Sequence, residues 1–346
     1  FAPWVGHDGV SGITRTAAGT EVHKGLGVGA NYWDLLPFGG KDALATITMV
    51  DALRRMASLE KAIAGHPDWG IPDPAQDRTS DQLQALAKTM TTRFQDIFWN
   101  PVTGRFAASV DAEGVAHDYG YTFVNNEALT FGMASAAQAT SIMEWLSGRR
   151  TVEGDTSTGA DIYHFRFGPR ASTRRNIEWY TFAWSRPEGI AWGGQVQDGG
   201  AVLGFAYHDM MAKLLTSGPD AAWAVLHRTL DWFADVRAEG GYRAYYAKPG
   251  RGTLQGGGPP GGLGMDCEFY ESVLVPQVML YGFLGIRALP DGLALDPRLP
   301  SDWPALEVTR IRFRTVTLDV RAEADTVVLE GVQGLALRTL LYVPDG

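Results

Sequence analysis

Three stretches of this chain place carboxylates or amides beside aromatic residues, each just before an expected helix. Carboxyl groups work in pairs as general acid and general base, and aromatic faces stack on sugar rings. Cleavage of a glycosidic bond is the reaction that most naturally uses such a pair. The residues are Trp33, Asp34 and Asp42 in the first stretch, Trp192, Gln195, Gln197 and Asp198 in the second, and Asp266, Glu268, Tyr270 and Glu271 in the third.

Asp34 is the first candidate for the acid, because the neighbouring indole of Trp33 would desolvate its carboxyl and raise its pKa. A carboxylate before a helix also has an ordinary structural explanation, since it caps the free N–H groups and complements the helix dipole. For any one stretch, that explanation is at least as good as catalysis. Three such stretches in one chain favour a site.

Other classes of enzyme lack their motifs here. The chain has no Gly-x-Gly-x-x-Gly after an expected strand, no Walker loop, no Gly-x-Ser-x-Gly and no His-Glu-x-x-His. Its seven histidines are scattered without metal spacing, and Cys267 is the one cysteine, so we expect no metal, no cofactor and no intrachain disulfide. His164, two residues before Arg166, either contacts substrate or is a surface-loop histidine.

The overall composition narrows the choice of partners. A formal net charge of −9 argues against nucleic acid and anionic membranes. No apolar run approaches the ~18 residues of a membrane span. A single cysteine fits a reducing compartment and is equally compatible with export, so the location stays open. The expected partner is an oligosaccharide or glycoside substrate.

Apolar residues three to four positions apart predict a series of helices that come in pairs. Long irregular linkers join them, and the longest, 149–190, has the length of a functional loop. This layout is that of a helical toroid whose loops form a site at one end. The predicted helices cover 43–64, 82–98, 124–133, 136–146, 201–215, 220–236 and 268–281.

After Ile286 the pattern changes to β-branched residues with partial alternation. The expected fold is therefore mainly α, with a helical domain over 1–288 and a small antiparallel β domain over 289–346 that covers one side of it. A short hairpin is also expected within 105–120. The predicted strands of the β domain are 308–313, 315–320, 326–329 and 335–343.

Short motifs along the chain resemble the inverting glycosidases with an (α/α)6 barrel, the group of trehalases, glucoamylases and processing α-glucosidases. Tyr32-Trp33-Asp34 before a helix is similar to the aromatic–acid pair that carries that group's general acid. Glu268-Phe269-Tyr270 matches the Glu-x-Tyr form of its general-base element, and Trp192 to Asp198 resembles its Gly-rich substrate loop. The link from Gly282 to Trp303 resembles the end of the barrel in maltose-phosphorylase-like enzymes, where a short β unit also follows.

The resemblance implies an exo-acting, inverting hydrolase of an α-linked glucoside or related glycan, with Asp34 as general acid and Glu268 as general base. Asp198 competes with Asp34 for the first role, and Glu271 competes with Glu268 for the second. Asn126 and Glu127 either bind sugar or cap a helix. The expected substrate contacts come from Trp33, Asp42, Asn126, Glu127, Arg166, Trp192, Gln195, Gln197, Tyr270 and Glu271.

Two rival functions stay open. A phosphorylase would keep the acid and replace the base by a phosphate site, for which Arg166, Arg174 and Arg175 are candidates. A non-catalytic carbohydrate-binding protein would bind sugar without turnover.

The number of helices is open as well, because seven are predicted where a full barrel has twelve. Either the first helices and the usual N-terminal β-sandwich precede Phe1, or further helices lie in 149–190.

Overall fold

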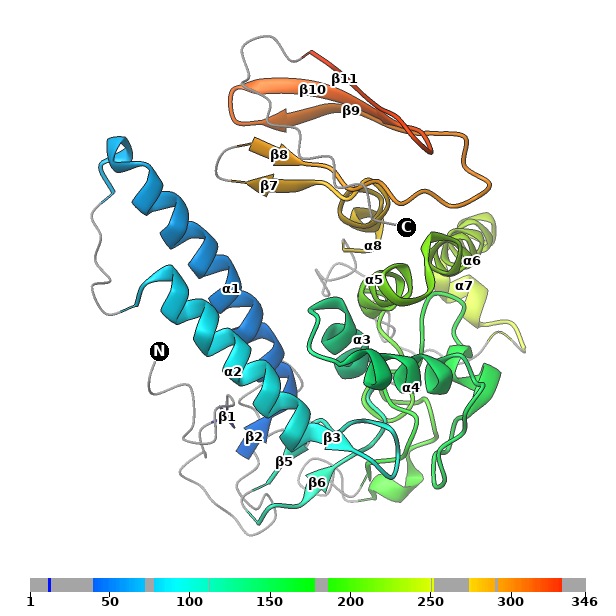
Figure 1. Cartoon of the computed structure of the whole chain (residues 1–346). Coiled ribbons are helices and arrows are strands. Elements are labelled where there is room, and N and C mark those ends of the chain that lie inside the picture. Colours follow the sequence, from blue (N-terminus) through cyan, green and yellow to red (C-terminus); the bar gives the residue numbers. More distant parts are fainter. Residues whose placement is uncertain are drawn as a thin grey trace.

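The first layer of the fold is a pair of long antiparallel helices, α1 (Ala43–Gly65) and α2 (Ser80–Phe98) (Figure 1). The computed structural model describes residues 12–13, 40–71, 78–111, 113–177, 186–249, 251, 274–289 and 292–331. Both helices are confirmed where apolar spacing predicted them, because the spaced side chains are those that enter the main core. Among the described residues, no helix combines the length and apolar character needed to cross a membrane.

Both of these helices begin at a side-chain cap. The Asp42 carboxylate accepts a hydrogen bond from Ala45 N (2.7 Å), which satisfies one free donor of α1. Thr79 and Gln82 form a reciprocal capping box, in which Thr79 Oγ1 accepts from Gln82 N (3.3 Å) and Gln82 Oε1 accepts from Thr79 N (2.8 Å). These local bonds explain why the helix starts are readable in the sequence.

Helices that are not consecutive in the chain contact one another in a row. Helix α1 contacts α3, α3 contacts α5 and α5 contacts α8, while α2 packs on α1 and α6 packs on α5. The predicted pairs 43–64 with 82–98 and 201–215 with 220–236 are confirmed, but α3 packs more extensively on α5 than on α4. The α-helices are α3 (Thr122–Thr130), α4 (Ala136–Leu146), α5 (Phe205–Ser217), α6 (Pro219–Ala238), α7 (Tyr242–Tyr246) and α8 (Leu274–Val278). A π-helical turn, η9 (Met279–Phe283), follows α8. The 3-10 turns are η3 (Pro67–Trp69), η4 (Gly159–Tyr163) and η6 (Pro187–Gly189).

The structure adds three points to the helix predictions. The described part of 149–190 (149–177 and 186–190) contains the 3-10 turns η4 and η6 and no α-helix. The helix expected over 268–281 is seen from Leu274, and it widens into the π-helical turn η9; its earlier residues lie outside the described part. Helix α7 was not predicted, because five residues are too few to show a helical period.

A small antiparallel sheet lies at the end of the molecule where α1 begins (Figure 1). The expected hairpin within 105–120 is confirmed in part, since Ser109 of β5 lies opposite His117 of β6. Gly40–Asp42, expected as loop, is strand β2 and pairs with β5. The strands are β1 (Gly12–Ile13), β2 (Gly40–Asp42), β5 (Ser109–Val110) and β6 (Ala116–His117) in the order β1-β2-β5-β6, with β3 (Trp99–Asn100) paired separately to β4 (Arg105–Phe106).

The C-terminal strands form two antiparallel units at the opposite end of the molecule (Figure 1). The first three strands predicted for the β domain are confirmed, and the fourth, 335–343, lies outside the described residues. The link after Leu289, expected as turns, contributes a strand to a hairpin. The bounds are β7 (Arg287–Leu289) paired with β8 (Gly292–Ala294), and β9 (Leu306–Phe313), β10 (Val316–Ala322) and β11 (Val327–Glu330) in the order β11-β10-β9.

These strands share an apolar core with the helices. Trp303 packs edge-on against Trp223 of α6 (4.9 Å between ring centroids) and against Phe283 (5.0 Å). Asp220, at the start of α6, accepts a hydrogen bond from Ser301 N (2.6 Å). One buried cluster contains apolar residues of α5, α6, α8 and the strands β8 to β10. The β unit therefore lies against the start of α6 and shares a core with α5.

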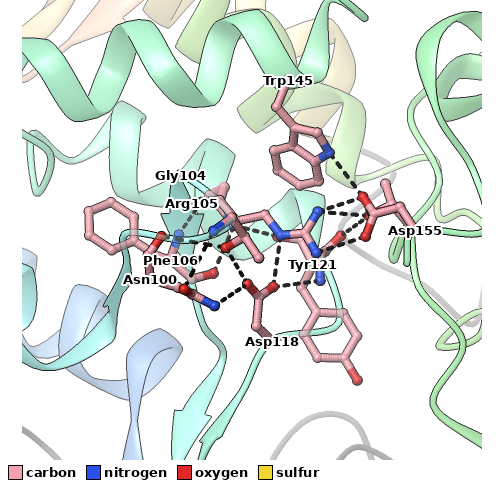
Figure 2. A network of polar contacts seen from close by, with 12 residues as sticks. Asn100, Gly104, Arg105, Phe106, Asp118, Tyr121, Trp145 and Asp155 are labelled. Carbon is pink, nitrogen blue, oxygen red and sulfur yellow. Dashed lines mark hydrogen bonds and ion pairs between the residues drawn. The ribbon is translucent and has the colours of Figure 1, made fainter. Parts of the chain in front are cut away.

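A buried arginine ties the middle of the chain together (Figure 2). The Arg105 side chain is 0% exposed and makes ion pairs with two carboxylates. Its Nε donates to Asp118 Oδ1 (2.7 Å), and its two terminal nitrogens donate to Asp155 (2.6 and 2.9 Å). The guanidinium also lies 4.6 Å from the ring centroid of Trp145 on α4. Burial alone would lower the Arg105 pKa, but these carboxylates outweigh it and raise the pKa.

The two carboxylates of this network are themselves saturated with donors. Asp118 accepts from Asn100, Thr103 and Gly120 N, and Asp155 accepts from Thr173 Oγ1 (2.8 Å) and Trp145 Nε1 (3.3 Å). A network in which each charged group is paired leaves no reactive atom, so it has a structural role.

Replacing Arg105 by Met should strongly destabilise the fold. The change leaves the Asp118 and Asp155 carboxylates without their counter-ion in a buried place, which costs about 3–5 kcal/mol in comparable sites. Urea unfolding followed by circular dichroism measures the loss. The control is Arg93→Met, which breaks an exposed pair with Asp96 at 4.0 Å and should cost less than about 1 kcal/mol. Equal losses in both variants would contradict the structural role of Arg105.

Candidate functional site

Backbone hydrogen bonds join the N-terminal ends of α1, α3 and α5. Ala43, the first residue of α1, donates to Ala108 O (2.9 Å) beside the β5–β6 hairpin that leads into α3. Thr122, the first residue of α3, donates to Ala171 O (3.0 Å), and Ala171 donates to Gly200 O (2.6 Å) just before α5. Asp42 and the stretch Trp192–Asp198 thus lie at the same end of three helices, although they are far apart in the sequence.

Asp42 lies at this end with its side chain almost fully buried, at 2% exposure. Burial raises its pKa to about 7, and the N–H groups of Ala45 and Leu44 oppose that rise. The carboxyl therefore exchanges its proton near neutral pH. It is also the cap of α1, so the structural explanation weighed for carboxylates before helices holds for Asp42.

Glu127 is a second carboxyl with a raised pKa. It lies in the middle of α3, on the face where Phe123 stacks on Phe205 of α5 (4.5 Å) and Asn126 Nδ2 donates to Asp209 Oδ1 (3.4 Å). Burial raises the pKa of Glu127 to about 8, so the carboxyl is mostly protonated at neutral pH. The alternative of helix capping is wrong for Glu127 and Asn126, because Tyr121 is the N-cap residue of α3.

A buried polar cluster lies next to Glu127. Tyr163 donates to Asp209 Oδ1 (2.7 Å), and Lys213 is hydrogen-bonded to both. Burial, with the Asp209 charge, raises the Tyr163 pKa well above its usual value, and burial lowers the Lys213 pKa. Asn126 Oδ1 and Asp209 Oδ2 are buried and have no hydrogen-bond partner among the described residues. These oxygens are acceptors that water or a ligand hydroxyl could satisfy.

The stretch Trp192–Asp198 is held by Arg170. This guanidinium donates to Gly199 O (2.5 Å) and to the Asp161 carboxylate (3.2 Å), and it lies 5.6 Å from the Trp192 ring centroid. Gly199 has a φ of +80°, and a Cβ there would come within 2.4 Å of the Trp192 ring. Trp192 Nε1 donates to Ser157 Oγ (2.9 Å). Much of the Trp192 indole is therefore engaged in shaping the loop.

Asp198 is also engaged in the loop. Its side chain is 0% exposed, its Oδ1 accepts from Asn176 N (3.1 Å), and its Oδ2 lies 2.9 Å from an Arg175 terminal nitrogen. Both carboxylate oxygens of Asp198 therefore face partners within the loop. The half-buried side chains of Gln195 and Gln197 make no hydrogen bond with the described residues, so their amides are available to a ligand.

The other predicted residues lie elsewhere or outside the described part. Arg166 is paired with Asp235 of α6 (2.6 Å) and lines a pocket that includes none of the residues 192–198. No cluster of three or more His, Cys, Asp or Glu side chains suited to a metal occurs in the described part of the chain. Trp33, Asp34, Asp266, Glu268, Tyr270 and Glu271 lie outside the described residues.

Sequence reasoning missed the protonated state of Glu127. The residue was weighed as a sugar contact or a cap, and nothing in Asn125-Asn126-Glu127 indicates a raised pKa. A partial signal existed, because Phe123 and Glu127 are four residues apart and so share a helix face. The neighbouring Asn125 is structural, since its side chain bonds both the N–H and the carbonyl of Phe106.

Comparisons with known proteins concern mainly the C-terminal part. Residues 286–344 match the C-terminal domain of glycosyl hydrolase family 65. A stretch of 54 residues is 41% identical to an N,N'-diacetylchitobiose phosphorylase of Vibrio proteolyticus, covering 16% of this chain and 7% of that protein. The two matches together support a relation to glycoside hydrolases and phosphorylases, and the C-terminal match agrees with the resemblance inferred from the link after Gly282. The chain matches only a small part of the length of this relative.

A solved structure aligns with most of the chain. The GH78 family rhamnosidase of Bacillus sp. GL1 aligns over 95% of this chain and 28% of its own, with a TM-score of 0.48 and 12% identity. This likeness is too low to support a conclusion about fold or activity.

Replacing Glu127 by Gln should remove a pH dependence of stability. Because burial raises its pKa from 4.5 to about 8, the contribution of this group is full below pH 4.5 and declines as the pH rises toward 8. At about 1.4 kcal/mol per pKa unit, we expect the variant to be a few kcal/mol more stable relative to wild type at pH 8.5 than at pH 5. Urea unfolding at the two pH values measures this.

The control for this experiment is Glu153→Gln, at an exposed position with a side chain of the same type. It should change the free energy of unfolding by less than about 0.5 kcal/mol at both pH values. A pH-independent effect of Glu127→Gln would show that the Glu127 carboxyl is ionised at neutral pH.

Proposed function

We propose that this chain belongs to a glycoside hydrolase that cleaves its substrate with inversion, using an Asp/Glu acid–base pair. The observation that carries the proposal is that Asp42, with its raised pKa, and the stretch Trp192–Asp198 lie together at the end where α1, α3 and α5 begin. The C-terminal match to a glycosyl hydrolase domain supports the class independently, because it lies at the other end of the molecule.

The proposed site combines residues inferred from sequence with residues described by the structure. Asp34 protonates the leaving oxygen and Glu268 activates a water on the opposite face of the sugar. Inversion requires the two carboxyl groups to be about 6.5–9.5 Å apart. The protonated Glu127 and the amides of Gln195 and Gln197 hydrogen-bond sugar hydroxyls. Trp33, Asp42, Asn126, Trp192, Tyr270 and Glu271 complete the proposed contacts.

The helix contacts are consistent with a toroid. In an (α/α)6 barrel, alternate helices form an inner ring, and α1, α3, α5 and α8 follow one another in that way here, with α2 and α6 packed on α1 and α5. We propose that these four helices belong to an inner ring, and that Asp34 and Glu268 lie in the loops before its first and last described members.

A glycoside phosphorylase is the second candidate function. The name of the Vibrio proteolyticus relative favours it. The described arginines do not, because Arg166 is paired with Asp235 and Arg175 with Asp198, so two of the three candidate phosphate ligands already have a carboxylate. The geometry therefore favours water over phosphate as the nucleophile.

Proton NMR of the reaction on a panel of α- and β-linked glycosides tests this proposal. We expect free sugar without added phosphate, formed first as the anomer opposite to that of the substrate. Retention of configuration would exclude an inverting pair. Turnover that requires phosphate and yields a sugar phosphate would establish the second candidate instead.

The same assay with three variants tests the proposed roles. Asp34→Asn and Glu268→Gln remove proton transfer and should each lower kcat by about 10²–10⁴-fold. Glu127→Gln keeps a hydrogen-bond donor in place of the protonated carboxyl and should lower kcat/KM by no more than about tenfold. A loss with Glu127→Gln as large as that with Asp34→Asn would instead make Glu127 the acid.

A further inference from the structure

A pocket separate from the Trp192 loop lies between η4, α6 and α7. Its volume is about 290 Å³, at the lower end of the ~300–1,000 Å³ usual for small-molecule pockets, so it suits a small ligand. It is lined by residues just after η4 together with residues of α6, α7 and the segment after α7. The lining residues are His164, Phe165, Arg166, Trp232, Tyr245, Tyr246 and Arg251.

The base of this pocket is rigid and aromatic. Phe165, Trp232 and Tyr245 are each 2–3% exposed and belong to one buried cluster. Trp232 Nε1 donates to the hydroxyl of Tyr246 (3.1 Å), and the ring of Tyr246 meets that of Tyr245 at 4.9 Å. The ring positions are therefore set before any ligand arrives. The buried rings hold the base in place, and the half-buried Tyr246 and the exposed His164 are the lining rings that can face a ring-shaped ligand.

The rim of the pocket carries charged groups that are already paired. Arg166 pairs with Asp235 (2.6 Å), and Arg251 pairs with Glu239 (2.9 Å) while covering the Tyr245 ring (4.5 Å to its centroid). Burial and the charge of the nearby Arg170 lower the pKa of His164, so its imidazole is neutral at pH 7.

Further charged groups near the rim keep its net charge small. Glu239 also holds the exposed Lys248 (2.7 Å), and Asp161 lies 3.5 Å from His164. The rim thus offers guanidinium donors and carboxylate acceptors side by side with little excess charge. Such a surface matches the mixed donors and acceptors of hydroxyl groups better than it matches an anion.

Arg170 lies close both to this pocket and to the Trp192 loop. Its guanidinium lies 5.4 Å from the ring centroid of Phe165 on the pocket side and 5.6 Å from that of Trp192 on the loop side. None of the residues 192–198 lines the pocket, so the pocket and the loop are distinct and have Arg170 as a shared neighbour.

We propose that the pocket formed by η4, α6 and α7 binds a single neutral sugar ring, as a second carbohydrate site apart from the site of cleavage. Tyr246 and His164 take the apolar face of the ring, and the paired Arg166 and Arg251 with their carboxylates take its hydroxyls. The choice of a sugar as ligand rests on the proposed function, but binding here needs no catalysis.

Fluorine NMR of the chain labelled with 5-fluorotryptophan tests this proposal. The probes are glucose, galactose, N-acetylglucosamine and their methyl pyranosides, with inorganic phosphate in separate titrations. Trp232→Phe and Trp192→Phe variants assign the two resonances that report on the pocket and on the loop. We expect at least one of the sugars to shift the Trp232 resonance.

A matched pair of variants then locates the binding. The double variant His164→Ala/Arg251→Ala removes two rim groups. It should raise the sugar Kd measured at the Trp232 resonance by about tenfold or more. His227→Ala/Arg243→Ala removes one histidine and one arginine from exposed positions of α6 and α7 outside the pocket, and should leave the titration unchanged.

Each other outcome overturns the proposal. A Trp232 resonance that no sugar shifts, or a titration that both double variants affect equally, would show that the pocket is not a sugar site. A response to phosphate but not to sugars would replace the neutral ligand by an anion. Because the readout is binding, a chain that responds at Trp232 but turns over no glycoside would disprove the proposed function and leave this inference intact.

Discussion

The buried ion network around Arg105 is the interaction on which the site end of the molecule depends. Arg105 lies on β4, Asp118 precedes α3, Asp155 follows α4, and all three side chains meet in one place (Figure 2). Gly120 is required beside them, because it has a φ of +62° and a Cβ there would come within 2.7 Å of the guanidinium. The network sets where α3 starts, and α3 carries Glu127.

From that point the end of the molecule is held by short backbone links. The segment 171–174 bonds both the turn before α3 and the loop before α5, so that it bridges the two helices. Ser172 Oγ and Asn176 also donate to Gln197 O, which ties this segment to the second carboxyl- and amide-bearing stretch. Residues widely separated in sequence are thereby placed around one end of α1, α3 and α5.

The candidate site residues differ in their structural and chemical roles. Asp198 and Trp192 are committed to the shape of the loop through Arg175, Arg170 and Ser157. Asp42 combines a cap with a pKa near 7. Glu127 has a carboxyl that burial keeps protonated, which is the state that a proton or hydrogen-bond donor to a sugar requires. The C-terminal strands pack at the opposite end of the molecule. The match of this segment to the C-terminal domain of glycosyl hydrolase family 65 therefore gives no direct information about the site.

The sequence by itself determined the helix starts, the long helices and most of the C-terminal strands. These features depend on local signals, such as the Thr79/Gln82 capping box and the regular apolar spacing of α1, which neighbouring residues carry. The tertiary structure decided the protonation of Glu127, the pairing of Asp198 and the position of Arg166 in an aromatic pocket. Burial and partner charges come from segments far apart in the chain, so no local pattern contains them.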